Sequence, residues 1–374
     1  MLKQRRTETD SKALAEIDRA VTDLRRGALV VLRTPDTALL VAAAEAVTDA
    51  ILARLTRLAA TPLALALTHR RAVALGLASP QNAPGSGLLL ALGAGTKAAL
   101  LRDLADPMAS APAQLSMAVV DATLRIAADA ALELAKIAHL LPAAVIAPLS
   151  RAALHRIAEA EGLPVIDGAH IGDYQASAAR TLRPVSEANV PLRDAGNARV
   201  IAFRPSDGGL EHLAILIGNP DPSEPVLTRL HSACFTGDLL GSLRCDCGDQ
   251  LHGAIAELAR TGSGVLLYLA QEGRGIGLVN KLRAYQLQDA GFDTVDANEQ
   301  LGFDADERVY LPGVEMLRQL GITRVRLLTN NPEKVAALTR CGIAVIERVP
   351  HIFPANGHNE RYLKTKAARS GHLL

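Results

Sequence analysis

Apolar residues recur along the chain at two spacings, one typical of amphipathic helices and the other of strands. In the first half the two patterns alternate, as they do in α/β proteins. They predict, in order, a helix at 9–26, a strand at 28–34, a helix at 36–58, a strand at 62–68, a turn-rich break at 79–87, a helix over about 115–140, and a βαβ unit at 143–168.

The second half begins with three expected antiparallel strands, at 198–205, 212–218 and 225–232. Expected helices at 250–262, 279–291, 314–321 and 332–342 then alternate with strands at 263–270, 325–329 and 344–349. The pattern predicts an α/β chain of two domains with α+β character. We predict a flexible N-terminus at 1–10, a first domain at 11–182, a linker at 183–196 and a second domain at 197–374.

Composition supports two separate cores and excludes some partners. A chain of 374 residues is too long for one ordinary core, and 49% hydrophobic with 21% charged residues is typical of a globular protein. The net charge of +1 gives no general surface for nucleic acid, so any affinity for phosphate must come from locally placed Arg and Lys. We find no apolar signal region and no run of 18 apolar residues, and we predict a cytoplasmic protein without a membrane segment.

Three of the four cysteines, Cys234, Cys245 and Cys247, lie in one short segment. In a chain without an export signal, such a thiolate cluster more often holds zinc than forms disulfides. Three protein ligands leave one tetrahedral position open, which is typical of catalytic zinc, whereas structural zinc is closed by four ligands. Catalytic zinc, structural zinc and reduced core cysteines all fit this segment. Cys341 stands apart, and we expect a small buried residue there.

Five sequence blocks in this half carry a family resemblance. They cover residues 231–238, 242–248, 271–308, 324–343 and 346–374. In this order and spacing they closely resemble GTP cyclohydrolase II, from about Val190 to the C-terminus. The resemblance implies zinc-dependent hydrolysis of GTP to 2,5-diamino-6-(5-phosphoribosylamino)pyrimidin-4(3H)-one, formate and diphosphate, the first step of riboflavin biosynthesis. It also implies Mg²⁺ with the GTP phosphates and a homodimer.

The resemblance assigns roles to individual residues. It implies that Cys234, Cys245 and Cys247 hold one Zn²⁺ per chain with a water, that Asp306 accepts a proton and that Arg308 acts at the α-phosphorus. Arginine stays protonated, so electrostatic stabilisation suits it better than nucleophilic attack. Tyr285 would orient the ring-opened formamide, although it could equally be a tyrosine at the edge of a core. The expected GTP contacts are Arg229, His231, Ser232, Gln250, Glu272, Gly273, Arg274, Thr294, Thr329 and Lys334.

Some of these assignments have plainer alternatives. Asp306 and Arg308 could form an ordinary surface ion pair, and each polar contact residue could be a solvated loop side chain. His231 is near the cysteines, but three thiolates already serve as ligands in this family, so we do not expect it to bind metal. Ala233 and Ala270 replace a Glu and an Arg that are common in the family, which puts the affinity for GTP in question more than the chemistry.

The first half resembles 3,4-dihydroxy-2-butanone-4-phosphate synthase, but without that family's catalytic motifs. The matching phrases are at 17–32, 41–48, 101–107, 131–149 and 158–166. The acidic run expected after the first strand is replaced at Arg33–Leu40, and a Gly-His-Thr-Glu motif is replaced at Ala127–Leu134. Loss of carboxylates and histidine removes the Mg²⁺ ligands and the proton-transfer groups. We therefore expect a retained fold that is catalytically silent and serves assembly or stability.

Two other functions remain open from the sequence. One is a bifunctional enzyme that also makes 3,4-dihydroxy-2-butanone 4-phosphate, and the missing acidic run argues against it. The other is a non-enzymatic nucleotide-sensing module with structural zinc, which would need a fourth protein ligand.

Overall fold

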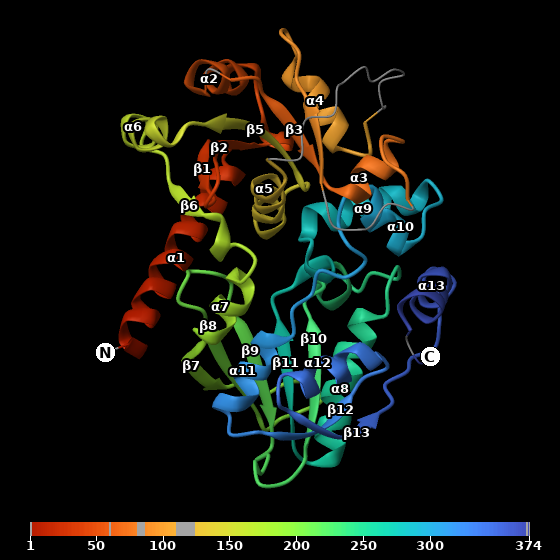
Figure 1. Ribbon diagram of the computed structural model, residues 1–374. Helices are drawn as coiled ribbons and strands as arrows, with labels where there is room; N and C mark the ends of the chain where they lie inside the picture. The colour runs from red at the N-terminus through yellow and green to blue at the C-terminus, as the bar shows by residue number, and fades with distance from the viewer. Residues whose placement is uncertain (1, 60, 81–86, 110–123, 372, 374) are drawn as a thin grey trace. The chain divides into compact units, whose positions relative to one another are not determined.

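The computed structural model describes residues 2–59, 61–80, 87–109, 124–371 and 373, and these residues form two compact units (Figure 1). Unit 1 comprises Met1–Tyr174 and Val279–Glu307, and unit 2 comprises Gln175–Leu278 and Arg308–Leu374. The predicted mixed α/β fold with two domains is confirmed. The units, however, do not divide at the expected linker alone, because residues 279–307 belong with the N-terminal unit.

Unit 1 contains one sheet, the helices that surround it and the returning segment 279–307. Its elements are α1 (Leu2–Arg25), β1 (Val30–Arg33), β2 (Ala38–Ala43), α2 (Asp49–Ala59), β3 (Ala64–Leu67), α3 (His69–Ala74), β4 (Leu88–Ala91), α4 (Ala98–Ala105), α5 (Arg125–Ile137), β5 (Ala143–Leu149), α6 (Arg151–Glu161), β6 (Val165–Asp167), α9 (Leu278–Asp289, whose first residue belongs to unit 2) and α10 (Thr294–Gln300). Helix α7 (Tyr174–Arg180) has only its first residue in unit 1 and otherwise belongs to unit 2.

The six strands of unit 1 pair in the order β4-β3-β5-β2-β1-β6. All neighbours are antiparallel except β1 and β6. Helices α1 and α5 contact one another and the central strands, and α2 contacts β2 and β5. Large aliphatic side chains such as Ile17, Leu39 and Leu65 are fully buried between these layers. As predicted, β5, α6 and β6 form a parallel crossover, with β2 and β1 between the two strands.

Three expectations for unit 1 need correction or lie partly outside the described residues. The helix expected at 36–58 begins as strand β2, because all six residues of Ala38–Ala43 are buried between β1 and β5. A continuous apolar run has no period that separates strand from helix. Residues 2–10, expected as a flexible terminus, have helical conformation in α1. The helix expected over 115–140 is seen as α5, and residues 110–123 lie outside the described ranges.

Unit 2 contains a second sheet with helices on both faces. Its elements are β7 (Arg183–Asn189), β8 (Ala198–Arg204), β9 (His212–Ile217), β10 (Val226–Ser232), a π-helical turn (Phe235–Leu239), α8 (Cys247–Thr261), β11 (Gly264–Leu269), a 3₁₀ turn (Glu272–Gly275), α11 (Leu311–Gln319), β12 (Arg324–Leu328), α12 (Pro332–Arg340), β13 (Ala344–Val349) and α13 (Glu360–Ser370).

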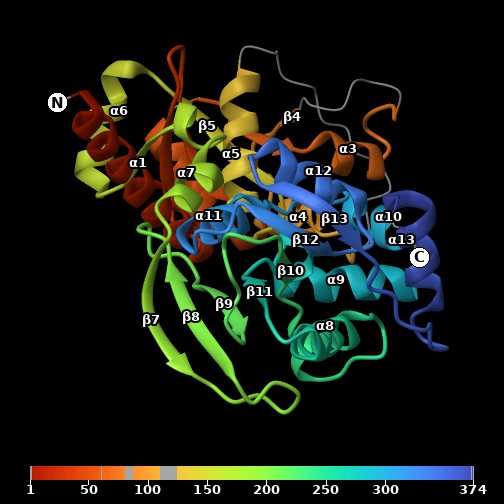
Figure 2. The ribbon, with the colours of Figure 1, turned by 90° about the horizontal axis from the view of Figure 1, so that it is seen from below.

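The seven strands of unit 2 pair in the order β13-β12-β10-β11-β9-β8-β7. The first four strands in this order are mutually parallel, and the remaining pairs are antiparallel. Helix α8 buries Ala254, Ile255 and Leu258 in one apolar cluster with the sheet. Side chains of α11 and α12, including Val314 and Leu338, belong to a separate cluster with it. Figure 2 shows β7 and β8 side by side at the antiparallel end of this sheet.

Two expectations for unit 2 differ from the structure. Residues 183–189 of the expected linker form the edge strand β7, whose residues are all exposed, so no apolar alternation reveals it in the sequence. The strand at 225–232 is parallel to its neighbours, because β11 lies between β10 and β9. Within the described ranges, no helix combines the length and apolar character needed to cross a membrane.

Candidate functional site

The candidate site begins where the parallel strands of unit 2 end. Strand β10 leads to Cys234, β11 leads to Glu272, and β12 leads to Thr329. Because β10 lies between β11 and β12 and runs parallel to both, all three strands end at one edge of the sheet. Loops at the carboxyl ends of parallel strands are where α/β folds usually bind ligands. The topology therefore gathers expected site residues from three distant parts of the sequence.

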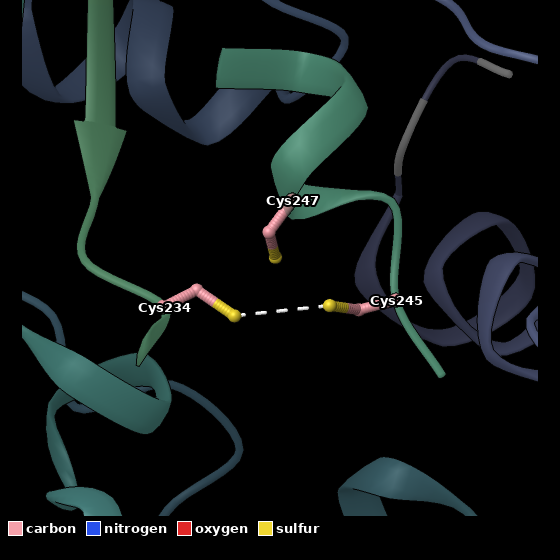
Figure 3. Close-up of side chains that lie close together, drawn as sticks. All are labelled: Cys234, Cys245 and Cys247. Atoms are coloured by element: carbon pink, nitrogen blue, oxygen red, sulfur yellow. Dashed lines mark hydrogen bonds between the residues drawn. The ribbon is translucent and has the colours of Figure 1, made fainter. Parts of the chain in front are cut away.

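The three cysteines converge from two loops and a helix end. Figure 3 shows Cys234 just after β10, Cys245 in the loop before α8, and Cys247 at the first turn of α8, with their sulfur atoms facing one another. All three Sγ atoms lie within 4.8 Å of one another, and those of Cys234 and Cys245 are 3.7 Å apart. The predicted cluster is thus formed in space as well as in sequence.

Gly237 lets the backbone approach this cluster closely. A Cβ atom at this position would lie 2.9 Å from Sγ of Cys245, 3.0 Å from Sγ of Cys234 and 2.8 Å from Cβ of Cys247. Its amide N–H donates to Sγ of Cys234 at 3.3 Å. The turn that contains Gly237 therefore closes one side of the thiols and supplies a donor that favours a thiolate.

The thiols suit a bound cation. The hydrogen bond with Cys234, together with burial, raises the pKa of Cys245 to about 11. Hydrogen bonds with Cys234 and Cys245, together with burial, raise the pKa of Cys247 well above its usual range. A cation would reverse this effect, because metal ligation requires thiolates and displaces their protons. Within the described part of the chain, no His, Asp or Glu ligand atom joins the three sulfurs at this spacing. Soft thiolate donors with one open position fit zinc of the catalytic kind.

Asp238 connects the cysteine loop to β10 and β11, and it was not identified from the sequence. Its carboxylate lies 3.0 Å from Nε2 of His231, accepts from the amide of Cys234 at 2.9 Å and accepts from the hydroxyl of Tyr268 at 2.9 Å. His231 also stacks on Tyr268, with ring centroids 5.6 Å apart. Burial lowers the pKa of His231. His231 thus supports the cysteine loop through Asp238.

Arg229 lies buried on β10 beside this network. One of its terminal nitrogens donates to the carbonyl of Leu328 at 2.9 Å, and the other donates to Gln250, whose amide donates to Asp246. Burial lowers the pKa of Arg229 to about 10, although Asp246 opposes this effect. Asp246 is a second contributor that the sequence did not single out. The contacts of Gln250 with Arg229 and Asp246 account for the position of its side chain.

Several buried polar atoms on β10 have no hydrogen-bond partner among the described residues. They are Nε of Arg229, Nδ1 of His231 and Oγ of Ser232. Buried polar groups are normally paired, and an unsatisfied group calls for a ligand, a water or another explanation. Three such atoms at the end of one strand, next to the thiols, therefore favour a polar ligand there.

The segment after β11 has an unusual backbone conformation. Gly273 and Arg274 both have left-handed φ angles, 64° and 61°, and a non-glycine residue adopts this region rarely. The carboxylate of Glu272 accepts from the amides of Phe235 at 2.6 Å and Gly273 at 3.0 Å. These bonds hold Glu272 against the cysteine loop. Local strain of this kind is concentrated at binding and catalytic sites.

Two of the expected GTP contacts, Thr329 and Lys334, lie at the end of β12 and in the first turn of α12. Thr329 is buried, and its hydroxyl accepts from the amide of Asn331 at 3.0 Å. Asn331 caps α12, and Lys334 follows in the first turn of that helix. The ammonium group of Lys334 is buried, donates to the carbonyl of Leu230 at 2.9 Å and lies 5.8 Å from the ring centroid of Tyr310. A buried cation at a helix N-terminus is suited to phosphate.

The expected catalytic residues are divided between the units. Arg308 belongs to unit 2, and its guanidinium lies 5.8 Å from the ring centroid of Tyr310. Tyr285, Thr294 and Asp306 belong to unit 1. Tyr285 is half-buried on α9 with the ammonium of Lys281 5.7 Å from its ring centroid, Thr294 begins α10, and Asp306 is exposed. The structure therefore gathers the thiols, Arg229 and Lys334 with Arg308, and it describes the other three residues in a separate unit.

The chain is similar to several known proteins. The sequence model of GTP cyclohydrolase II matches residues 183–350. A "GTP cyclohydrolase-2" of Azospirillum brasilense is 55% identical over 373 residues, covering 98% of this chain and 95% of that protein. Another "GTP cyclohydrolase-2", of Cronobacter sakazakii, is 54% identical over 193 residues, which are 52% of this chain and 98% of that protein.

Among solved structures, a two-domain 3,4-dihydroxy-2-butanone 4-phosphate synthase from A. baumannii aligns with a TM-score of 0.36 and 19% identity, covering 84% of this chain and 93% of that one. The near full-length match to the Azospirillum protein is far stronger. By that match, this chain belongs to the GTP cyclohydrolase II family.

Proposed function

We propose that this protein hydrolyses GTP to 2,5-diamino-6-(5-phosphoribosylamino)pyrimidin-4(3H)-one, formate and diphosphate, at the start of riboflavin biosynthesis. The observation that carries the proposal is the set of three converging thiols at the same sheet edge as buried Arg229 and Lys334. A site for a soft metal ion beside cationic side chains suits a substrate with a hydrolysable ring and a triphosphate.

We propose that Cys234, Cys245 and Cys247 hold one Zn²⁺. When bound there, zinc supplies Lewis-acid activation for hydrolysis of the guanine ring. The chain contributes the geometry: Asp238 holds the amide of Cys234, and the close approach of Gly237 fixes the loop around the thiols. A nucleotide-sensing module would need the site closed by a fourth protein ligand, and the open position favours the enzyme.

Cationic side chains would bind and polarise the triphosphate. A nucleoside triphosphate carries about four negative charges, and charge-assisted hydrogen bonds from Arg229, Arg274 and Lys334 would neutralise them, with Mg²⁺ as counter-ion. Arg308 would stabilise the charge that develops at the α-phosphorus, because a guanidinium remains protonated. Thr329 and the first turn of α12 would add uncharged donors.

Acceptors and donors around the base would give specificity. The carboxylate of Glu272, which two backbone amides hold in place, would accept from the N1 and N2 hydrogens of guanine. Ser232, Gln250 and Gly273 would complete the contacts of this part of the site. From unit 1, Asp306 would accept a proton, Tyr285 would donate a hydrogen bond to the ring-opened formamide, and Thr294 would contact the nucleotide.

The N-terminal half would not be a second enzyme. The segments Arg33–Leu40 and Ala127–Leu134 offer no carboxylate cluster with histidine, and part of the first is the buried strand β2. We therefore propose no synthase activity towards ribulose 5-phosphate. A cytoplasmic location, which would keep the thiols reduced, and a homodimer complete the proposal.

The test is direct assay of the full chain. Purified protein with GTP and Mg²⁺ should release formate and diphosphate and form the diaminopyrimidine, all followed by liquid chromatography with mass detection. Metal analysis should give about one zinc per chain. Binding of GTP without turnover would replace the enzyme with the sensing module, and consumption of ribulose 5-phosphate would establish the bifunctional alternative.

A further inference from the structure

Segment 279–307 belongs to the C-terminal half of the sequence, but in the structure it packs with residues 1–174 in unit 1. It carries α9, α10 and the tract up to Glu307, and it therefore includes Tyr285 and Asp306. Its contacts with residues 1–174 are ion pairs and hydrogen bonds spaced along most of its length. They come from several separate parts of residues 1–174, and they are described below by the part of the segment that they hold.

Lys136, near the end of α5, holds the tract around Asp306. Its side chain is only 15% exposed, and its ammonium lies 2.8 Å from Oε1 of Glu307 and 3.5 Å from Oδ2 of Asp304. Glu307 also accepts from the amide of Asp304 at 2.8 Å, so these residues form a closed turn around Asp306. Burial alone would lower the pKa of Lys136, but the neighbouring carboxylates raise it, so the ammonium stays charged.

The start of α3 holds the end of α10. The hydroxyl of Thr68 donates to the carbonyl of Gly302 at 2.8 Å, and Arg70 pairs with Glu299 at 2.7 Å. Arg71 is buried and donates to the carbonyl of Gln300 at 3.1 Å. Gly302 has φ +88°, and a Cβ there would lie 2.8 Å from Oγ1 of Thr68, so this approach requires glycine.

Helix α9, which carries Tyr285, is held in a similar way. Arg283 lies 3.4 Å from the carboxylate of Glu45 and 3.7 Å from that of Asp106. The amide of Asn280 donates to the carbonyl of His139 at 2.9 Å. Both contacts lie within one or two helical turns of Tyr285. The N-terminal unit thus fixes the segment on either side of both expected catalytic residues.

We infer that the N-terminal unit is a positioning scaffold for catalysis, and that Lys136 is the positioning residue for Asp306. The inference rests on the proposed function and extends it. Lys136 lies on α5, in which Ala127–Leu134 replaces the Gly-His-Thr-Glu motif of the synthase family. Helix α5 instead holds a segment that comes from the C-terminal half of the sequence. Small displacements of a catalytic group lower rates strongly, and a residue that holds its neighbours on both sides controls its position.

The test compares two substitutions in the same unit of the full-length protein. Lys136→Gln removes the ammonium that binds Asp304 and Glu307. Arg54→Gln is the matched control, because Arg54 pairs with Glu161 at 2.6 Å and is partly buried, yet neither residue belongs to or is bonded to segment 279–307. We expect Lys136→Gln to lower kcat for GTP about ten- to a hundredfold with zinc content unchanged. Arg54→Gln should keep kcat within twofold, and Lys136→Arg should recover most of the lost rate.

Hydrogen exchange gives a second readout that does not need turnover. Amides at 303–308 should exchange faster in Lys136→Gln than in Arg54→Gln, because the local structure opens. Equal kcat and equal exchange in the two variants would overturn the inference. If the unmodified protein turned over no GTP, the proposed function would fail, and the exchange rates would still decide whether Lys136 holds the segment.

Discussion

The two sheets of this protein use the ends of their strands differently. In unit 2, four adjacent parallel strands end at one edge, and Cys234, Glu272 and Thr329 follow three of them. In unit 1, all neighbours except β1 and β6 are antiparallel, so most adjacent strands end at opposite edges.

The difference indicates where in a sheet a binding site can form. When adjacent strands are parallel, residues from distant parts of the sequence meet at one edge of the sheet, as they do after β10, β11 and β12. In unit 1, Thr68 and Arg71 follow β3 and bind segment 279–307. Three buried polar atoms on β10 thus lack a partner among the described residues, whereas these polar groups of unit 1 hold another part of the chain.

The largest expected effect is at the three clustered cysteines of unit 2. Cys245→Ser should remove zinc and abolish GTP turnover, because a hydroxyl is a poor substitute for a thiolate in a three-ligand site. Metal analysis and formate release measure the two outcomes separately. Cys341→Ser, at the end of α12, is the matched control and should keep both. A zinc-free Cys245→Ser protein with full activity would contradict the proposed role of the cluster.

The next effect concerns charge at the phosphate. Arg308→Ala should lower turnover and diphosphate release about 10³-fold, because a preorganised cation at a phosphoryl centre is lost. Zinc content should not change. Arg318→Ala is the control, since Arg318 is a partly exposed arginine of α11 that pairs with Glu315 at 2.5 Å. Wild-type diphosphate release by Arg308→Ala would remove Arg308 from the mechanism.

The smallest expected effect concerns Asp238, which holds the loop that carries Cys234. Asp238→Asn keeps the shape but cannot accept equally from His231, Cys234 and Tyr268, and zinc affinity should fall about tenfold, as for other residues that orient metal ligands. Competition with a chelator measures this. Asp167→Asn, at the end of β6 in the other sheet, loses only an exposed pair with Arg33 at 3.0 Å and should leave zinc affinity unchanged. Equal effects would show that the two sheets do not differ as described.

Sequence patterns predicted most elements, because their apolar residues repeat with a clear period. They failed at β2, where a fully buried run has no period, and at β7, where every residue is exposed. The cysteines were found from their spacing in the sequence, and Arg308 was found through a family motif. Asp238 and Lys136 were not, because their importance lies in partners that only the fold brings near. Lys136 and Glu307, for example, are far apart in the sequence and 2.8 Å apart in space.

Unit 2 is built from two stretches of the sequence that segment 279–307 separates, and this affects how it folds during synthesis on the ribosome. Residues 1–174 emerge first, and domains generally fold as units during translation, so segment 279–307 should meet a surface that is already formed. The sheet of unit 2 must wait longer, because β12 is the neighbour of β10 and is made almost last. Until then β10, which is buried in the finished fold, has an unpaired edge that can pair with other chains. A nascent chain that ends before β12 should therefore aggregate, even though its N-terminal half is folded.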